Sequence, residues 1–275
     1  MKLFVSDLDG TLLNNEQELS ETTIKIINNL IDKGMNFTVA TARSFDSAWR
    51  IIKPLKIKLP MILINGVYVY DPAAGENLVS NYVEKSEAEE ILKFLEENDI
   101  SPFVYTTNSQ KENRVYYKGI FNRAQEGYTG DRLSKGDKRF RLVDDLKVSL
   151  DQDIIAIVCI GGDRLEDAYG ILKERLDLSY HYSIDIYTKE PFFEITNKYA
   201  NKRDSLLFLK EYLYADELIS FGDNLNDLPM FEVSDYCYAV ENADILVKQA
   251  ATKVIKSNTD NGVALFLEEY FNSGA

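Results

Sequence analysis

The chain has 275 residues, of which 45% are hydrophobic and 28% charged, and its formal net charge is −14. This length accommodates one large domain or two modest ones with a sizeable core. The strong negative charge argues against nucleic acid and against an anionic membrane surface as partners. A phosphorylated ligand would therefore have to be held by local positive groups.

The cysteine pattern favours a reduced, cytoplasmic protein. Cys159 and Cys237 lie far apart in apolar runs, so packed thiols are expected rather than a disulfide or a metal pair. No apolar stretch approaches membrane-spanning length, and the first residues lack the charged-then-apolar order of a signal peptide. A single histidine excludes a histidine-rich zinc site. The sequence leaves the oligomeric state open and is compatible with a monomer.

An apolar run over residues 2–5 predicts a first strand that ends in Ser6-Asp7-Leu8-Asp9-Gly10-Thr11-Leu12. Strand side chains alternate between two faces, so Asp7 and Asp9 can point to the same side where the strand ends. Gly10 permits a sharp turn there. A single Asp at such a place is typical of a turn or a helix cap. Two acids at the carboxyl end of a parallel strand instead predict a divalent-cation site and a carboxylate nucleophile.

Strands and helices then alternate, which predicts a parallel sheet with helices on its faces. The expected elements are a helix capped by Ser20 and ending at Gly34, a strand over 35–40, a helix over about 45–52, a strand over 61–64 and a hairpin over 67–81. The second strand ends at Thr41-Ala42-Arg43, and the third ends at Asn65-Gly66. Polar groups therefore follow three successive strands.

The pattern changes near Glu84. The expected elements are a helix opened by a capping box at Ser86-Glu87-Ala88-Glu89 and running to about Glu97, strands over 103–107 and 114–118, a polar stretch over 122–138, a strand over 154–160, a helix over 165–176 and a strand over 179–188. We expect the polar stretch to be mobile in part. This order predicts an α+β domain over 84–189, whose sheet is covered by helices on one face.

The strand–helix alternation returns after Pro191. The expected elements are a strand over 192–195, a helix over 201–213, a strand over 218–221 ending in Gly222-Asp223-Asn224-Leu225-Asn226-Asp227, strands over 236–240 and 253–255, and a helix over 263–270. The fold class is therefore α/β, with a Rossmann-like, parallel-sheet core domain formed by 1–83 and 190–275. The domain over 84–189 is inserted into it, which is physically cheap where the two ends lie close.

The opening string Asp-Leu-Asp-Gly-Thr-Leu closely resembles the first motif of the haloacid dehalogenase-like (HAD) phosphohydrolases. Thr41, Lys202 and the Gly-Asp-x-x-Asn-Asp string at 222–227 match the order and character of that family's other motifs. The inserted segment is similar to the family's type IIB cap, as in the Cof-like sugar-phosphate phosphatases. Ala42 stands where that branch more often has Gly.

The resemblance implies a role for each motif residue. Asp7 would be the nucleophile that forms an aspartyl-phosphate, and Asp9 the general acid and then the general base. Thr41 would donate a hydrogen bond to a phosphoryl oxygen, and Lys202 would neutralise charge and restrain Asp7. The surrounding Ala200-Asn201-Lys202-Arg203 departs from the family's usual small-Ser-Lys-Gly, so Arg203 is a neighbouring cation that could be mistaken for the functional one.

The same resemblance implies a magnesium site made of oxygen ligands. Asp223 would coordinate Mg²⁺ with Asp7 and the backbone carbonyl of Asp9. Asp227 would hold a metal-bound water or steer Lys202. Substrate contacts are expected from Thr41, Ala42, Arg43, Asn65, Gly66, Lys202 and Asn226. Asn65-Gly66 is equally well read as a turn at a strand end.

The predicted function is a Mg²⁺-dependent phosphatase of small phosphorylated metabolites, with sugar phosphates as the first choice. The inserted domain would set specificity by closing over the site. Its candidate contacts are Tyr116, Tyr117, Arg123, Arg139, Arg141, Tyr187 and Lys189. One alternative is a phosphosugar mutase. Another is a non-catalytic phospho-receiver or sugar-phosphate sensor, which would need neither an acid–base residue at Asp9 nor an inserted domain.

Overall fold

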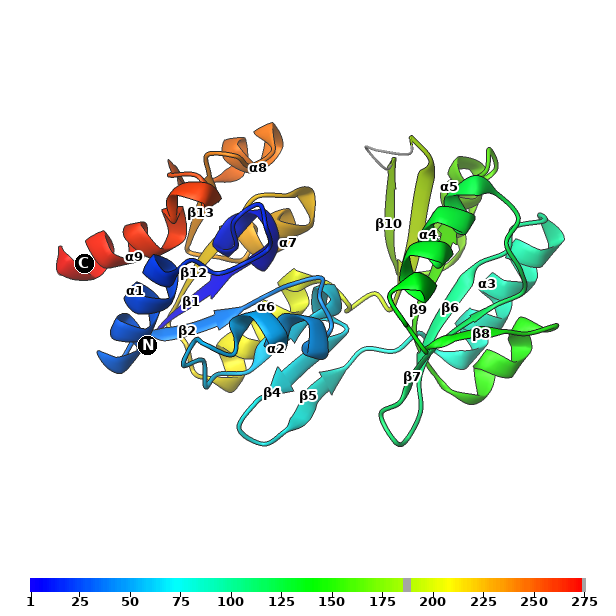
Figure 1. Ribbon diagram of the computed structural model, residues 1–275, viewed down its shortest axis with the longest axis horizontal. Coiled ribbons are helices and arrows are strands. Elements are labelled where there is room, and N and C mark those ends of the chain that lie inside the picture. The colour runs from blue at the N-terminus through cyan, green and yellow to red at the C-terminus, as the bar shows by residue number, and fades with distance from the viewer. Residues whose placement is uncertain (185–188, 274–275) are drawn as a thin grey trace. The chain divides into compact units, whose positions relative to one another are not determined.

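The computed structural model of the chain describes residues 1–184 and 189–273. It divides into two compact units, Met1–Ser80 with Ala200–Ala275, and Asn81–Tyr199. Figure 1 labels their helices and strands. Within the described residues no helix combines the length and apolar character that a membrane span requires.

The first unit contains a five-stranded parallel sheet in the order β14-β13-β12-β1-β2. Its strands are β1 (Lys2–Ser6), β2 (Asn36–Val39), β12 (Glu217–Gly222), β13 (Tyr236–Val240) and β14 (Lys253–Ile255). The first strand lies between β2 and β12, so both its edges are hydrogen-bonded within the sheet. Leu3, Phe4 and Val5 are buried, which shows that both faces of the strand are covered. This arrangement brings the end of β1 beside the end of a strand that is more than 200 residues away in sequence.

A second, three-stranded sheet lies beside β2, the edge strand of the parallel sheet. It consists of β3 (Met61–Leu63), β4 (Tyr68–Asp71) and β5 (Glu76–Ser80) in antiparallel pairs. A single parallel bridge between Ala40 and Ile62 connects β3 with the end of β2. The predicted hairpin over 67–81 is therefore present, and β3 brings its own end to the edge where β1 and β2 end.

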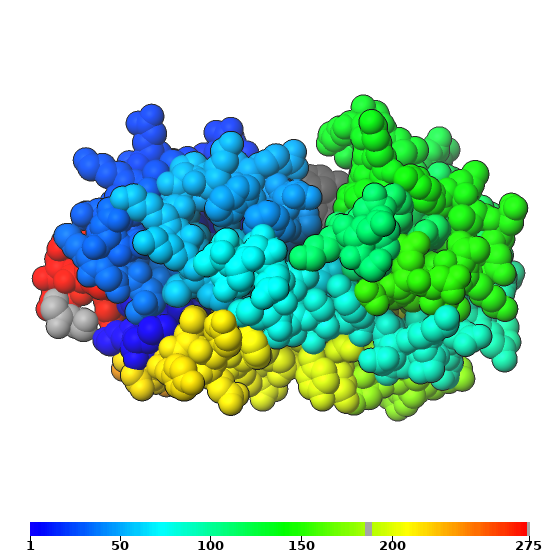
Figure 2. Space-filling model, turned by 90° about the horizontal axis from the view of Figure 1, so that it is seen from below, coloured from blue at the N-terminus to red at the C-terminus, as the bar shows by residue number. Residues whose placement is uncertain are grey.

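Helices complete the first unit: α1 (Glu21–Asp32), α2 (Phe45–Ile52), α6 (Lys202–Tyr212), α7 (Leu228–Phe231), α8 (Ile245–Ala250) and α9 (Gly262–Asn272). The predicted cap of α1 is confirmed, because Ser20 Oγ accepts a hydrogen bond from the Thr23 N–H at 3.0 Å. The start of the chain lies beside the segment that follows α6 (dark blue and yellow in Figure 2), where the Met1 carbonyl accepts from the Asp216 N–H at 2.8 Å.

The second unit is a six-stranded sheet in the order β10-β11-β9-β6-β7-β8, antiparallel except for β7 and β8. Its strands are β6 (Phe103–Thr107), β7 (Asn113–Tyr117), β8 (Phe140–Leu142), β9 (Asp153–Ile160), β10 (Ser179–Ile184) and β11 (Pro191–Thr196). The helices α3 (Lys85–Glu97) and α5 (Leu165–Arg175) pack on one face, with Ile91 and Leu172 in the same buried cluster as Val104. The rest of the predicted strand over 179–188 and the candidate Tyr187 lie outside the described residues.

Strand β11 differs from the prediction, which gave residues 192–195 to the core domain. It pairs antiparallel with both β9 and β10, so that Phe193 lies opposite Cys159 and Tyr182. Phe193 and Ile195 are fully buried in the core of the second unit. The second unit accordingly continues to Tyr199 rather than to residue 189.

The polar stretch over 122–138 also differs, because it contains a helix, α4 (Arg123–Ser134). Asn122 caps this helix by accepting from the Gln125 N–H at 2.8 Å. Tyr128 contacts Phe103 at 5.3 Å between ring centroids, and Phe103 points away from the face on which Val104 packs. Helices therefore cover both faces of this sheet, not one.

The start of α3 also differs from the prediction. The predicted capping box began at Ser86, but the helix begins at Lys85 with Glu84 as its N-cap. The Glu87 carboxylate accepts from the Glu84 N–H at 3.3 Å. Glu87 thus occupies the third helical position, and Ser86 lies inside the first turn.

Candidate active site

The end of β1 is followed by a sharp turn, η1 (Leu8–Leu12), in which Asp9 and Gly10 have non-helical backbone angles. The Asp7 N–H donates to the Phe221 carbonyl at 3.0 Å, which fixes the start of the turn against β12. Gly10 has φ of +76°, and a Cβ there would lie 2.4 Å from Asp223 Oδ2. Glycine is therefore required both by the backbone conformation and by the close approach of Asp223.

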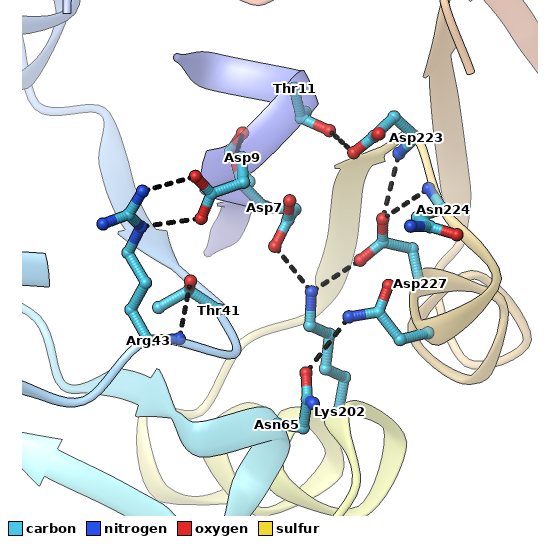
Figure 3. A network of polar contacts seen from close by, with 12 residues as sticks. Asp7, Asp9, Thr11, Thr41, Arg43, Asn65, Lys202, Asp223, Asn224 and Asp227 are labelled. Carbon is cyan, nitrogen blue, oxygen red and sulfur yellow. Dashed lines mark hydrogen bonds and ion pairs between the residues drawn. The ribbon is translucent and has the colours of Figure 1, made fainter. Parts of the chain in front are cut away.

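Lys202 forms the centre of a buried ionic network (Figure 3). Its ammonium nitrogen lies 2.7 Å from Asp7 Oδ1 and 2.6 Å from Asp227 Oδ1, and its side chain is fully buried. It occupies the first position of α6, which Asn201 caps by accepting from the Asp204 N–H at 2.9 Å. Burial opposes the charge, but Asp227 and Asp7 outweigh it and raise the pKa of Lys202 above its ordinary value. The neighbouring Arg203 is exposed and is not part of this network.

Asp227 connects Lys202 to the loop after β12. It ends the short 3-10 segment η4 (Leu225–Asp227), and its Oδ2 accepts from the N–H groups of Asp223 and Asn224 at 2.9 and 3.1 Å. Because the same carboxylate also contacts Lys202, the loop that carries Asp223 is fixed relative to Asp7.

Asp223 faces Asp7 and Asp227 across a space that suits a cation. One carboxylate oxygen from each of the three residues lies within 4.8 Å of the others. Thr11 donates to Asp223 Oδ1 at 2.7 Å, which orients that side chain. Burial is the main cause that raises the pKa of Asp7 to about 8 and that of Asp223 to about 6. An oxygen-only donor set that carries excess negative charge fits a hard divalent cation.

The Asp9 carboxylate forms a bidentate pair with Arg43 at one side of the site (Figure 3). Arg43 Nε donates to Oδ2 at 2.7 Å and Nη2 donates to Oδ1 at 2.6 Å. The hydrogen bond to Asp9 raises the pKa of Arg43 against the effect of burial. The fully buried Thr41 accepts from the Arg43 backbone N–H through its Oγ1 at 3.1 Å.

The remaining predicted residues lie around this centre. Asn65 has a left-handed backbone, with φ of 49°, and its Oδ1 accepts from Asn226 Nδ2 at 3.1 Å. Gly66 approaches the start of α6 so closely that a Cβ would lie 2.3 Å from the Asn201 carbonyl oxygen. Ala42 is exposed. Asn65 thus joins the third strand end to the loop after β12, and Gly66 joins it to the start of the helix that carries Lys202.

Several contacting residues were missed by the sequence analysis. Thr11 belongs to the opening motif, so its position two residues after Asp9 could have indicated its contact with Asp223. Gln17 and Ser47 both contact Arg43, but no motif or periodicity marks them. Asn242 donates to the Gly10 carbonyl at 2.7 Å and belongs to a loop that the sequence left unassigned.

The candidate contacts in the second unit do not form one group. Tyr116 packs against the buried cluster on the α3 and α5 side, whereas Tyr117 contacts Phe103 on the other face. Arg139 is engaged by Asp137 through an ion pair at 2.6 Å, and that hydrogen-bonded pair raises the pKa of Arg139. Arg123, Arg141 and Lys189 are also described within this unit.

The chain is similar to known hydrolases and phosphatases over most of its length. A family model for haloacid dehalogenase-like hydrolases matches residues 4–267. The 5-amino-6-(5-phospho-D-ribitylamino)uracil phosphatase YwtE of Bacillus subtilis is 29% identical over 98% of this chain and 98% of its own length. Phosphatase YwpJ of the same organism is 28% identical over 96% of this chain and 98% of its own.

A solved structure supports the fold over nearly the whole chain. A protein from Thermotoga maritima superposes with a TM-score of 0.77 at 28% identity and covers 97% of this chain and 96% of that one. The similarity therefore extends across both units.

Proposed function

Because the chain belongs to the haloacid dehalogenase-like hydrolases, we propose that it is a Mg²⁺-dependent phosphatase of small phosphorylated metabolites. The observation that carries this proposal is the buried Lys202, whose ammonium lies between the Asp7 and Asp227 carboxylates with Asp223 close by. A carboxylate fixed beside a buried cation and a hard-cation site would supply a nucleophile and charge stabilisation for in-line phosphoryl transfer.

The metal would be held by the Asp7 and Asp223 carboxylates together with the Asp9 backbone carbonyl. Mg²⁺ suits this place because the side-chain donors are oxygens only. When bound there, the metal supplies positive charge beside the phosphoryl group. Both oxygens of Asp227 are already engaged, by Lys202 and by the backbone of Asp223 and Asn224, which favours an orienting role for that residue.

Asp7 would act as the nucleophile. Its carboxylate oxygen forms a bond to phosphorus as the bond from phosphorus to the leaving oxygen breaks, which gives an aspartyl-phosphate. Lys202 would hold the carboxylate in place through Asp7 Oδ1 and offset charge on the phosphoryl oxygens. Water then attacks phosphorus and regenerates Asp7 with release of phosphate.

Asp9 would transfer the protons of the two steps. As acid it gives a proton to the leaving oxygen, and as base it takes one from the attacking water. In the structure both oxygens of Asp9 accept from Arg43, so one of these hydrogen bonds would open when Asp9 exchanges a proton, while the other keeps the carboxyl group oriented. Thr41 would contact a phosphoryl oxygen from the end of β2.

The proposed substrate is a phosphate monoester of a hydroxylated carbon chain, with sugar phosphates as the first class to test. YwtE carries in its name the phosphate of a ribityl chain, which shares this chemistry. A panel of sugar, polyol and nucleotide monophosphates, assayed for phosphate release with and without Mg²⁺, tests the proposal. We expect Mg²⁺-dependent release that is absent in Asp7→Asn. Phosphate migration within a bisphosphorylated sugar without release would instead indicate a mutase, and no turnover with any ester would contradict the proposal.

A further inference from the structure

A turn outside the recognised motifs contacts the Asp9–Arg43 pair. Gln17 Oε1 accepts from Arg43 Nη2 at 2.7 Å, and the same nitrogen donates to Asp9 Oδ1 at 2.6 Å. Ser47 Oγ accepts from the other terminal nitrogen, Nη1, at 3.1 Å. The guanidinium is therefore held on three sides, and its plane is set by more than the carboxylate that it orients.

The turn that presents Gln17 is itself fixed. Asn14 and Glu18 close it, because the Asn14 N–H donates to the Glu18 carbonyl at 3.0 Å and Asn14 Oδ1 accepts from the Glu18 N–H at 2.9 Å. Gln17 has φ of +61°, a left-handed conformation that is uncommon for residues other than glycine. The buried Asn258 donates to the Leu13 carbonyl at 2.9 Å and anchors the base of the turn.

We propose that Gln17 is a positioning residue for the proton transfer by Asp9. Gln17 does not touch the reacting atoms; it restrains Arg43, and Arg43 in turn directs the Asp9 carboxyl group. The inference rests on the proposed phosphatase function. Without the Gln17 acceptor, Arg43 would rotate more freely, and Asp9 would spend less time facing the leaving oxygen.

Loss of the Gln17 side chain should slow the reaction only with leaving groups that need a proton. When the bond from phosphorus to the leaving oxygen breaks in an alkyl phosphate, the proton of Asp9 moves to the alkoxide oxygen. In para-nitrophenyl phosphate the departing phenolate is stable without that proton. The ratio kcat/KM includes only the steps up to departure of the leaving group, so it isolates this proton transfer from the later hydrolysis.

The test measures kcat/KM of the full-length Gln17→Ala enzyme with beta-glycerophosphate and with para-nitrophenyl phosphate. We expect a loss of roughly tenfold with the alkyl ester, a small part of what a general acid contributes, and little change with the nitrophenyl ester. Glu16→Ala in the same turn is the matched control, because its exposed side chain makes no contact with Arg43. Gln17→Glu keeps an acceptor oxygen at the same reach and should recover most of the loss.

Two results would overturn the inference: an equal loss with both esters, which indicates a general structural effect, or no loss with either. Thermal unfolding of Gln17→Ala should match that of the unsubstituted protein, since the side chain is exposed. If the unsubstituted protein hydrolyses neither ester and no member of the metabolite panel, the proposed function fails. If it hydrolyses both and Gln17→Ala behaves as the control does, only the positioning role of Gln17 fails.

Discussion

The ammonium of Lys202 lies 2.7 Å from Asp7 Oδ1, although 195 positions separate the two residues in sequence. Asp227 holds the same ammonium from the other side at 2.6 Å. One buried cation thus joins the first strand, the start of α6 and the loop after β12. This contact links the folding of the first unit to its proposed chemistry.

Lys202→Met should reduce both stability and activity. The substitution leaves Asp7 and Asp227 as buried carboxylates without a cation, and breaking such a pair costs about 3–5 kcal/mol. We expect a lower Tm in thermal unfolding without metal and loss of measurable phosphate release. Arg203→Met is the matched control because Arg203 is the next residue of α6 and is exposed. Equal effects of the two substitutions would contradict the assignment of Lys202.

Gly10→Ala should weaken metal binding more than it weakens folding. The new Cβ would lie 2.4 Å from Asp223 Oδ2, so the carboxylate must move. We expect the Mg²⁺ concentration for half-maximal activity to rise roughly tenfold or more. Gly75→Ala isolates the backbone effect, since Gly75 has φ of +73° and open space around it. A Mg²⁺ requirement that is the same in both variants would show that Asp223 does not depend on Gly10.

The stabilising effect of Mg²⁺ should increase with pH. Burial raises the pKa of Asp223 from 3.8 to about 6, so the folded protein binds protons more tightly than the unfolded chain. Without metal, the stability that this group contributes is present at low pH and is lost as pH rises from about 4 to about 6. The raised pKa of Asp7 acts in the same direction.

A cation beside these carboxylates offsets that loss, because it stabilises their ionised form. Thermal unfolding at pH 5 and pH 8, with and without Mg²⁺, measures the effect. We expect the rise in Tm on adding Mg²⁺ to be larger at pH 8. A rise that is equal at both pH values, or larger at pH 5, would mean that Asp7 and Asp223 do not bind the metal.

Asn122→Ala should destabilise the second unit. Asn122 accepts from the Gln125 N–H at the start of α4 and donates to the Ile160 carbonyl at 2.9 Å. Loss of the cap costs about 1–2 kcal/mol. Asn122→Asp keeps the capping oxygen and loses only the donor. Its unfolding midpoint in urea should therefore lie between those of the unsubstituted chain and of Asn122→Ala. If Asn122→Ala unfolds at the same urea concentration as the unsubstituted chain, the cap does not stabilise α4.

Local sequence signals predicted most elements of the first unit and several of the residues that the structure brings together around Lys202. The apolar spacing of α1 and the carboxylates that follow β1 are encoded within short windows, and parallel strand ends share one edge of a sheet. The wrong predictions concern elements whose place in the fold depends on contacts with distant parts of the chain. Phe192–Ile195 reads as a strand, but which sheet it joins is decided by pairing with β9 and β10. Helix α4 buries Gln125 and Thr129, so its inward face lacks an apolar period.

The residues of the candidate site differ in the same way. Asp7, Asp223 and Lys202 follow a motif order that can be recognised along the chain. The pairing of Asp9 with Arg43 arises only when β1 and β2 lie side by side. Gln17 contacts Arg43 from a turn in which its own backbone is left-handed. Because this residue is not a glycine, the sequence does not indicate that conformation.

Trapping of the phosphorylated intermediate would show whether Asp7 accepts the phosphoryl group. The full-length enzyme is mixed with a radiolabelled phosphate ester and Mg²⁺, quenched in acid within milliseconds, and its labelled peptide is mapped. We expect acid-stable, base-labile label on Asp7, and no label in Asp7→Asn. Label on another residue, or turnover by Asp7→Asn at the rate of the unsubstituted enzyme, would contradict this role of Asp7.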